Sequence, residues 1–367
     1  MINRSIVRES DDISGFYFPD IVTDGSKLIC CYVESQNHSI RKGSRLWISR
    51  SDDFGIHWEH QIISESDIAG DSFWNAPRMI VDIDLKITIV IDKMPAVKIG
   101  YDFQSDLGDQ ARLEVWAFES DNLGQTWNKR KTMITGLCPS ISHAINGDVV
   151  VAVNKFDAFD GIRKVQTWRS NSLYSNEWIT ALVPGQKNVC EGELIEIGDK
   201  WILLMRAMSS VCVPGARSIS ADGCRTWSEP EGFIVPGGMH RPNAARLRSG
   251  HFFISSRLFA GSGAGSQMTI ASLVPEWSML APRISQNALI MPLDYNARCD
   301  SDQGYTGSCQ IDDGTIFVVN YLNPPGHGTG IYFYQLMESD FDDSMKKQKP
   351  IYEYALIGGN NGKKICS

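Results

Sequence analysis

The chain has 367 residues, 43% of them hydrophobic and 21% charged, and a formal net charge of −8 at pH 7. This composition excludes collagen, coiled-coil and disordered proteins, and a net acidic chain has no general attraction for nucleic acid or for an anionic membrane surface. The sequence contains no apolar run of about 18 residues, the length that a transmembrane helix needs.

The first residues and the cysteines bear on the compartment of the protein. Residues 1–16 lack the apolar segment and cleavage site of a signal peptide, which favours a cytoplasmic protein and leaves secretion or association with a virion open. The 9 cysteines are odd in number, and they have neither CxxC spacing nor the Cys/His spacing of a metal site. We therefore predict free thiols, no metal site and no cofactor.

Six short apolar segments, each interrupted by a tight turn, follow one another along the chain. Their residues are largely β-branched or aromatic, as in Leu28–Val33 and Ile316–Val319, and each segment predicts a β-hairpin. In chain order the turns are Asp24-Gly25, Asp82-Ile83-Asp84, Asn146-Gly147, Gly198-Asp199, Ser249-Gly250 and Asp313-Gly314. Their spacing of about 50 to 65 residues indicates a repeat architecture.

A second motif, Ser-x-Asp/Asn-x-x-x-x-Trp, follows several of the hairpins. Complete copies begin at Ser51, Ser120 and Ser220, and weaker copies begin at Ser170 and Ser272. The Ser and Asp side chains can bond nearby backbone amides, which predicts a turn, and the Trp can pack between sheets. A period of this length with about four strands per unit is typical of a β-propeller.

We therefore predict an all-β protein with a single domain, a six-bladed β-propeller of four-stranded antiparallel blades. A two-sheet sandwich is the competing interpretation, but sandwiches lack a Trp-bearing turn at this period. The closing strand of the last blade comes either from the N-terminal segment around Ser5 or from Ile351–Ile357. The predicted blades span residues 14–60, 74–130, 138–180, 190–230, 240–280 and 303–357.

The Trp-bearing turns resemble the Asp-box, or BNR, repeats of the sialidase superfamily, and the resemblance covers nearly the whole chain. The copies are imperfect, since His57 stands for the usual Thr, Asn122 for Asp and Cys224 for Gly. The resemblance is specific for the fold and much less so for the substrate.

In a propeller, the start of each innermost strand and the end of the second strand open on one face, opposite the hairpin turns. Counting back and forward from the turns brings several arginines, carboxylates, hydroxyls and imidazoles to this mouth. Guanidinium groups pair well with carboxylates and sulfates, so the mouth favours an anionic ligand. The predicted ligand-binding residues are Arg206, Arg241, Arg257, Arg78, His240, Tyr17, Asn243 and Tyr321.

The resemblance to sialidases implies catalytic roles at this mouth. Cys190–Arg206 resembles the sialidase segment that begins with the partner of the nucleophile, Glu191 here, and ends with a carboxylate-binding arginine, Arg206. Asp302–Tyr321 resembles the last sialidase blade, which supplies a tyrosine nucleophile, and this assigns Tyr305. A phenol has a pKa of about 10 and needs an adjacent carboxylate to activate it.

The chain departs from the sialidase pattern at three positions. Phe16–Pro19 lacks the first arginine of the sialidase triad, and the third is also missing, with Arg241 or Arg257 as candidate replacements. The loop after Glu34 contains no aspartate for the acid/base role. Glu34 is therefore the predicted proton donor, and His38 is the next candidate.

The leading prediction is a sialidase-like glycoside hydrolase acting on the acidic sugar of a glycan, with Tyr305, Glu191 and Glu34 as catalytic residues. A polysaccharide lyase is an alternative, in which Tyr305 acts as acid/base with His240 or His143 and arginines neutralise a uronate. A non-catalytic glycan-binding propeller is the third interpretation, favoured by the missing sialidase residues. The predicted partner is an acidic carbohydrate, with no nucleic acid and no membrane, and the sequence leaves the oligomeric state open.

Overall fold

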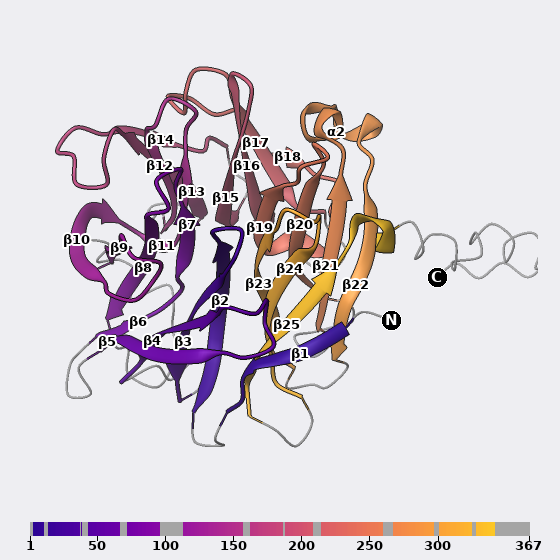
Figure 1. Ribbon diagram of the computed structural model, residues 1–367. Helices are drawn as coiled ribbons and strands as arrows, with labels where there is room; N and C mark the ends of the chain where they lie inside the picture. The colour runs from indigo at the N-terminus through magenta and orange to yellow at the C-terminus, as the bar shows by residue number, and fades with distance from the viewer. Residues whose placement is uncertain are drawn as a thin grey trace, which may run out of the picture.

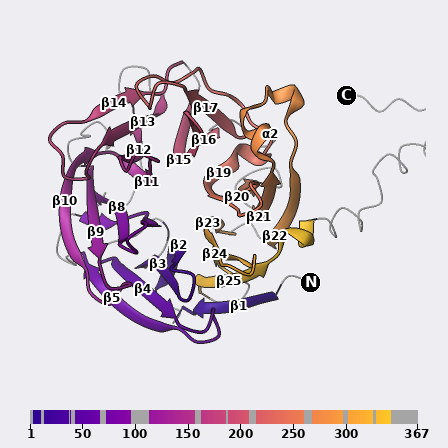
Figure 2. The ribbon, with the colours of Figure 1, turned by 45° about the horizontal axis from the view of Figure 1, so that its top comes forward.

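Six antiparallel sheets surround a central axis in the computed structural model, which confirms the predicted six-bladed all-β propeller (Figure 1). Figure 2 shows the blades following one another around the ring in chain order. Across the described part of the chain, no helix has the length and apolar character needed to span a bilayer. The structure describes residues 3–10, 14–36, 38, 43–66, 72–95, 113–156, 162–185, 188–207, 214–259, 267–296, 301–324 and 328–341.

Blades 1 to 3 occupy the first half of the chain. Blade 1 contains β2 (Gly15–Thr23), β3 (Leu28–Ser35), β4 (Arg45–Ser51) and β5 (Glu59–Glu65). Blade 2 contains β6 (Ser72–Trp74), β7 (Arg78–Val81), β8 (Ile87–Pro95), β9 (Glu114–Ser120) and β10 (Asn128–Thr135). Blade 3 contains β11 (Leu137–His143), β12 (Val149–Phe156), β13 (Arg163–Ser170) and β14 (Ile179–Leu182). In blade 2 the innermost strand is split, so that β6 and β7 both pair with β8.

Blades 4 to 6 complete the ring. Blade 4 contains β15 (Val189–Ile197), β16 (Lys200–Ala207), β17 (Ala216–Ser220) and β18 (Glu231–Gly232). Blade 5 contains β19 (His240–Arg246), β20 (Phe252–Phe259), β21 (Gln267–Val274) and β22 (Leu289–Asn296). Blade 6 contains β23 (Gln303–Gln310), β24 (Ile316–Leu322), β25 (Gly330–Leu336) and β1 (Asn3–Arg8).

The N-terminal strand closes the ring. β1 pairs with β25, with Asn3 opposite Gln335 and Ser5 opposite Phe333, and so supplies the fourth strand of blade 6. This settles one of the two alternatives that the sequence left open. The other candidate, Ile351–Ile357, lies outside the described residues.

Blade 5 extends beyond its predicted end at residue 280. After β21 the chain forms the helix α2 (Glu276–Leu280) and the 3-10 helix η3 (Arg283–Ser285) before the outer strand β22 begins at Leu289. Pro275 and Pro282 precede these two helices, and a proline cannot donate to a strand ladder. A third short helix, η2 (Gly237–Met239), leads into β19.

The turns at the end of the ring opposite the candidate site follow the sequence pattern. Gly25 and Gly314 have φ angles of +94° and +91°, which a glycine adopts without steric cost. In the turn after β4, Ser51 Oγ accepts the Gly55 amide at 2.7 Å, and Asp53 Oδ1 accepts the His57 amide at 2.9 Å. The turns at Ser120 and Ser220 repeat these bonds.

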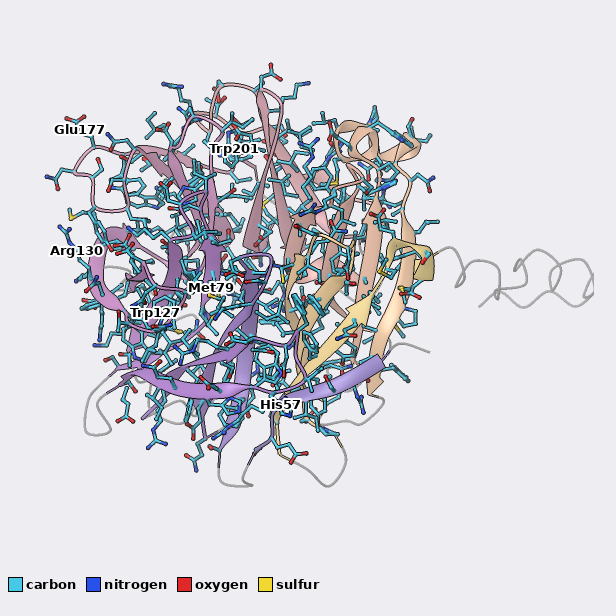
Figure 3. All side chains as sticks on the ribbon, viewed as in Figure 1. His57, Met79, Trp127, Arg130, Glu177 and Trp201 are labelled. Atoms are coloured by element: carbon cyan, nitrogen blue, oxygen red, sulfur yellow. The ribbon has the colours of Figure 1, made fainter. Side chains whose placement is uncertain are left out.

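The hydrophobic core is distributed between neighbouring blades rather than collected at one centre. In the cluster between blades 1 and 2, Ile29 and Ile48 pack with Ile87 and Phe118, and these side chains are at most 1% exposed. Burying one such side chain contributes about 1.5–3 kcal/mol to folding. Side chains fill the spaces between the ribbons (Figure 3), so the blades form one packed ring.

Candidate active site

The candidate site lies at the end of the ring opposite the hairpin turns. Glu191 and Tyr305 lie near the start of β15 and β23, and Arg206 lies near the end of β16. β15 and β16 are antiparallel, with Cys190 opposite Arg206, so the start of one strand and the end of the other share this end of the ring. Counting residues from the turns therefore placed these three residues at the same end of the ring as the structure does.

β-bulges near this end reorient the innermost strands of blades 1, 3, 4, 5 and 6. Each bulge holds one residue with a positive φ angle, a conformation that is costly for any residue with a Cβ. Bulges redirect side chains and are frequent next to active sites. The five residues are Phe18 (56°), Cys138 (48°), Glu191 (51°), Arg241 (41°) and Gly304 (95°).

Glu191, Arg206 and Tyr305 form what we call the mouth cluster. The Tyr305 hydroxyl donates a hydrogen bond to Glu191 Oε1 at 2.7 Å, the contact that the sequence predicts. Arg206 Nη1 lies 3.2 Å and 3.3 Å from the two Glu191 carboxylate oxygens and 3.2 Å from the Tyr305 hydroxyl oxygen. One guanidinium nitrogen therefore contacts both members of the predicted catalytic pair.

Hydrogen bonds with two neighbouring blades, one to a backbone amide and one to a side chain, hold Glu191 in place. The Arg241 amide of blade 5 donates to Glu191 Oε2 at 2.9 Å. The Glu191 amide donates to Asn154 Oδ1 of blade 3 at 2.5 Å, which satisfies the N–H that the bulge releases from strand pairing. Glu191 is 7% exposed, so its carboxylate is both buried and fixed before any ligand binds.

The surroundings move the pKa values of Glu191 and Tyr305 apart. Burial alone would raise the pKa of Glu191, but the charge of Arg206 and the Tyr305 hydrogen bond outweigh burial and lower this pKa to about 2. Burial and the negative charge of Glu191 raise the pKa of Tyr305 above its usual value. At neutral pH the pair is therefore an ionised carboxylate that accepts a hydrogen bond from a neutral phenol.

Arg206 is more exposed than the other two arginines near the mouth cluster. Its side chain is 19% exposed, and its Nε has no hydrogen-bond partner within the described residues. Arg241 and Arg257 are 3% and 5% exposed. The Nε is itself buried, so a ligand could contact only the exposed part of the Arg206 side chain.

Four further side chains form what we call the rim cluster, beside the mouth cluster. His38 Nδ1 lies 2.6 Å from Asp302 Oδ2. Asp302 Oδ1 accepts hydrogen bonds from Arg257 Nη2 at 3.0 Å and from the Tyr321 hydroxyl at 2.7 Å. Arg257 also lies 4.3 Å from the ring centroid of Tyr305 and so connects the two clusters.

An aromatic wall lines the blade 1 side of both clusters. The Phe18 ring lies 5.6 Å from Tyr305 and 5.7 Å from Tyr321, and Tyr17 lies 5.6 Å from Tyr321, measured between centroids. Tyr17 therefore lies beside the rim cluster. On the opposite side, burial and the charge of Arg206 lower the pKa of His240 to about 2, so its imidazole is neutral at neutral pH.

The structure places Arg78 below the mouth, whereas the sequence places it on the rim. Arg78 Nη1 and Nη2 donate to the carbonyls of Thr306 and Pro242, both at 2.6 Å, and the residue is 4% exposed. Asp20 and Glu193 lie 3.8 Å and 3.6 Å from the guanidinium. Because these partners belong to blades 1, 4, 5 and 6, Arg78 crosses the channel. We call Asp20, Arg78 and Glu193 the channel cluster.

Two other predicted ligand-binding residues connect blades. The Arg241 Nη2 donates to the carbonyls of Ala76 at 3.3 Å and Pro77 at 3.0 Å, and its backbone amide is the group that donates a hydrogen bond to Glu191. Asn243 Oδ1 accepts a hydrogen bond from Ser308 Oγ at 2.5 Å. The Arg241 side chain therefore links blade 5 to blade 2, and the Asn243 side chain links blade 5 to blade 6.

Glu34 lies apart from the mouth cluster. Its carboxylate accepts hydrogen bonds from Trp47 Nε1 at 2.7 Å and Ser14 Oγ at 2.8 Å, and lies 3.5 Å from Arg45. Among the described residues it has no contact with Glu191 or Tyr305. β3 pairs with β4 at this point, with Glu34 opposite Arg45, so the carboxylate is held by its own blade.

Asp302 is a site residue that sequence reasoning missed. It lies three positions before Tyr305, next to the start of an innermost strand. An acidic residue at such a position could have been predicted to face the mouth. Its partner His38 ranks second, after Glu34, among the proton donors that the sequence predicts. His38 and Asp302 are 264 positions apart in the sequence, so no local pattern connects them.

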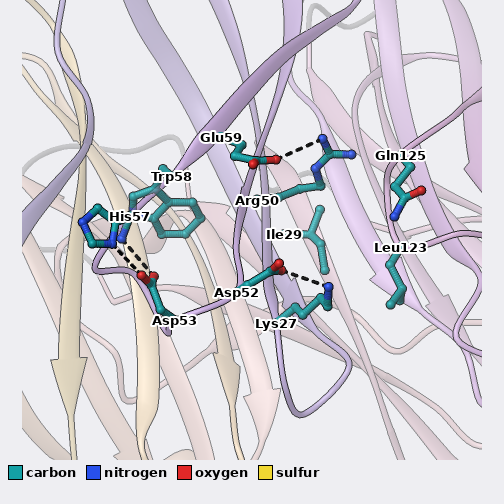
Figure 4. Close-up of a pocket in the computed structure, with 10 residues that line it drawn as sticks. All are labelled: Lys27, Ile29, Arg50, Asp52, Asp53, His57, Trp58, Glu59, Leu123 and Gln125. Carbon is teal, nitrogen blue, oxygen red and sulfur yellow. Dashed lines mark hydrogen bonds and ion pairs between the residues drawn. The ribbon is translucent and has the colours of Figure 1, made fainter.

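A second pocket, of about 270 Å³, lies between blades 1 and 2 at the end of the ring that carries the turns (Figure 4). Its charged side chains are paired with one another, as in Lys27 with Asp52 at 3.0 Å and His57 with Asp53 at 2.7 Å. His57 is 86% exposed. This pocket therefore lacks the buried groups with shifted pKa values that the mouth cluster has. Across the described residues, no group of His, Cys, Asp and Glu side chains is arranged to hold a metal ion.

Comparison with known proteins supports the fold. No protein-family model matches the chain, and no curated protein sequence matches it. A protein of unknown function from Dyadobacter fermentans superposes with a TM-score of 0.71 at 16% identity, over 90% of this chain and 97% of that one. The Hadza microbial sialidase Hz136 superposes with a TM-score of 0.68 at 18% identity, over 92% of this chain and 69% of that one.

A sialidase from Trypanosoma rangeli, solved with sialic acid bound, has the same architecture. It superposes with a TM-score of 0.66 at 14% identity and matches 100% of this chain. This chain covers 63% of the length of the trypanosomal protein. At such identities the comparison establishes a sialidase-like propeller fold, and the chemistry has to be argued from the side chains.

Proposed function

We propose that this protein is a sialidase-like glycoside hydrolase that cleaves an acidic sugar from a glycan or polysaccharide. The observation that carries the proposal is the hydrogen bond of 2.7 Å between the Tyr305 hydroxyl and the buried Glu191 carboxylate, with Arg206 against both groups. A buried tyrosine that only fills space does not need an ionised carboxylate at its hydroxyl. A tyrosine nucleophile does need one.

In the proposed first step, the Tyr305 oxygen attacks the anomeric carbon while the bond from that carbon to the leaving oxygen breaks. The hydroxyl proton passes to Glu191. In the second step, water attacks the same carbon, the bond to Tyr305 breaks, and Glu191 returns the proton to the phenolate. A neutral nucleophile avoids electrostatic repulsion by an acidic sugar, which is why this chemistry differs from the usual scheme with two carboxylates.

The acidic sugar is argued from Arg206. Its side chain is 19% exposed, so it is the guanidinium in the mouth cluster that a ligand carboxylate can reach. The same charge holds the pKa of Glu191 at about 2. A substrate carboxylate paired with Arg206 would offset that charge and raise the basicity of Glu191, so that binding of an acidic substrate itself activates the tyrosine.

The comparisons support the reaction class without extending to the substrate. The trypanosomal sialidase has been solved with sialic acid and, as a covalent intermediate, with 2,3-difluorosialic acid. Those ligands belong to that protein. The present chain lacks an arginine in Phe16–Pro19, so we assign it an acidic sugar and leave the particular sugar to experiment.

The test is to incubate the protein with a panel of glycans ending in sialic, glucuronic and galacturonic acid, and to measure product masses. We expect a product pair with one added water and, with a 2,3-difluoro acidic sugar, a covalent adduct on the Tyr305 peptide. An unsaturated product absorbing in the ultraviolet would instead establish a lyase. Binding without any product would establish a glycan-binding propeller.

A further inference from the structure

The proposed reaction leaves one role unfilled among the predicted residues. When the glycosidic bond breaks, the leaving oxygen needs a proton, which a positioned acid normally supplies. Glu34 is held by hydrogen bonds from Trp47 and Ser14 on the blade 1 side of the ring. The donor must instead lie beside Tyr305 and be open to the ligand.

We propose that His38 is the general acid and base of this site and that Asp302 is the residue that positions it. This inference rests on the proposed hydrolase function. The His38 side chain is 36% exposed, and its ring lies 5.1 Å from Phe18, the same ring that packs 5.6 Å from Tyr305. His38 and Tyr305 therefore both pack against one aromatic side chain at the mouth.

The hydrogen bond to Asp302 fixes the tautomer of His38. His38, Arg257 and Tyr321 hold the pKa of Asp302 well below its usual range despite its burial, so Asp302 is ionised and can only accept hydrogen bonds. His38 Nδ1 therefore donates to Asp302 at 2.6 Å. Nε2 is then the nitrogen that exchanges a proton with the substrate.

The protons balance over both steps. In the first step, the leaving oxygen keeps the electron pair of the broken bond and takes the proton from His38 Nε2. In the second step, the attacking water gives its proton back to Nε2, and the imidazolium is restored. Among the described residues, the polar groups near His38 include the Asp302 carboxylate, the phenols of Tyr17 and Tyr321, and Arg257 on the far oxygen of Asp302.

The test compares leaving groups that do and do not need an acid. Methyl and 4-nitrophenyl glycosides of sialic, glucuronic and galacturonic acid are assayed with the wild-type protein, and the sugar that is hydrolysed is then used with His38→Ala and His38→Gln. We expect kcat/KM, which reports the first step, to fall by about 10²-fold or more for the methyl glycoside and by less than about tenfold for the nitrophenyl glycoside. Asp302→Asn should lower the methyl glycoside rate less and shift the pH profile of kcat/KM.

A matched control is His57→Gln, on the opposite end of the ring, which should leave both rates unchanged. Equal losses on the two glycosides in both His38 variants, with folded protein by circular dichroism, would overturn the assignment, as would full activity on the methyl glycoside. If the wild-type protein hydrolyses none of the six glycosides, the proposed function itself fails. The two failures are therefore distinguishable.

Discussion

Glu191 and Glu193 lie two positions apart on β15, and both are buried, but their pKa values move in opposite directions. Glu191, in the mouth cluster, has a pKa lowered to about 2. Glu193, in the channel cluster, has a pKa raised to about 7 by its burial, against the weaker effect of Arg78. The difference lies in their partners. Glu191 accepts hydrogen bonds from Tyr305, Arg206 and a backbone amide, whereas Glu193 Oε2 has no hydrogen-bond partner within the described chain.

The comparison separates the candidate site from a buried contact between blades. In the channel cluster, the Arg78 donors are directed to backbone carbonyls, and the guanidinium is shared between Asp20 and Glu193 at 3.6–3.8 Å. In the mouth cluster, the guanidinium contacts the carboxylate and the phenol, and the side chain is 19% exposed. Buried charges alone therefore do not identify a reactive site, and the mouth cluster is distinguished by a partly exposed guanidinium beside a hydroxyl that is bonded to a carboxylate.

The largest expected effect comes from Tyr305→Phe. This change removes the proposed nucleophilic oxygen and leaves the ring packing in place, so turnover should fall by at least about 10³-fold, or roughly 4 kcal/mol of barrier, with ligand affinity nearly unchanged. Tyr321→Phe is the matched change of a neighbouring phenol and should cost less. A Tyr305→Phe variant that keeps more than about a tenth of the wild-type rate would remove Tyr305 from the mechanism.

Glu191→Gln should have the next largest effect. The amide keeps the size of the side chain but cannot take the phenol proton, and the expected loss in kcat is about 10²-fold, the usual range for a general base. Steady-state kinetics on the hydrolysed glycoside measures it. Glu193→Gln, two positions along the strand, should change kcat little, and similar losses in both variants would show that the mouth cluster has no special role.

Arg206→Ala tests the anion preference of the mouth cluster. Loss of a charged hydrogen bond should weaken binding of an acidic ligand by about 1.5–3 kcal/mol. Calorimetry with a uronic or sialic acid glycoside, and with its neutral methyl ester as control, measures the difference. Equal affinity of the wild-type protein for the acid and the ester would contradict the assignment.

The smallest effect is a dependence of stability on pH at Glu193. Its pKa of about 7 lies above the usual 4.5, so between these pH values unfolding releases a proton and rising pH destabilises the wild-type protein. Glu193→Gln removes this titration, and its free energy of unfolding relative to the wild type should increase by about 1–3 kcal/mol from pH 5 to pH 8. Urea unfolding at both pH values checks it; a difference that does not change with pH would place the titration elsewhere.

The fold was predictable because local signals repeat. Turns such as Asp24-Gly25 and Asp313-Gly314 mark the inner hairpin of each blade, and the Ser-x-Asp turn marks the passage to the outer strand. Counting from those turns also located Glu191, Arg206 and Tyr305 at one end of the ring. The strand–turn period of a propeller carries this information within each blade.

The remaining site geometry depends on contacts between blades, which a local pattern does not encode. A bulge with a positive φ at Arg241 directs its side chain towards Ala76 and Pro77, so the arginine expected to bind ligand ties two blades together. The Arg78 side chain enters the channel because its hydrogen-bond acceptors also lie on other blades. Strand counting assumes strict alternation, and each bulge shifts that alternation by one residue.

The closing strand β1 also affects when the candidate site forms during folding. β1 precedes every other described strand, yet it pairs with β25, so the ring closes by joining segments more than 300 residues apart. Inner hairpins are local and form quickly, whereas a contact of such sequence separation forms slowly. His38, Phe18 and Tyr305 come from blades on both sides of this seam. We expect activity to return later than far-ultraviolet circular dichroism during refolding, because the blades can form before the ring that holds their side chains together.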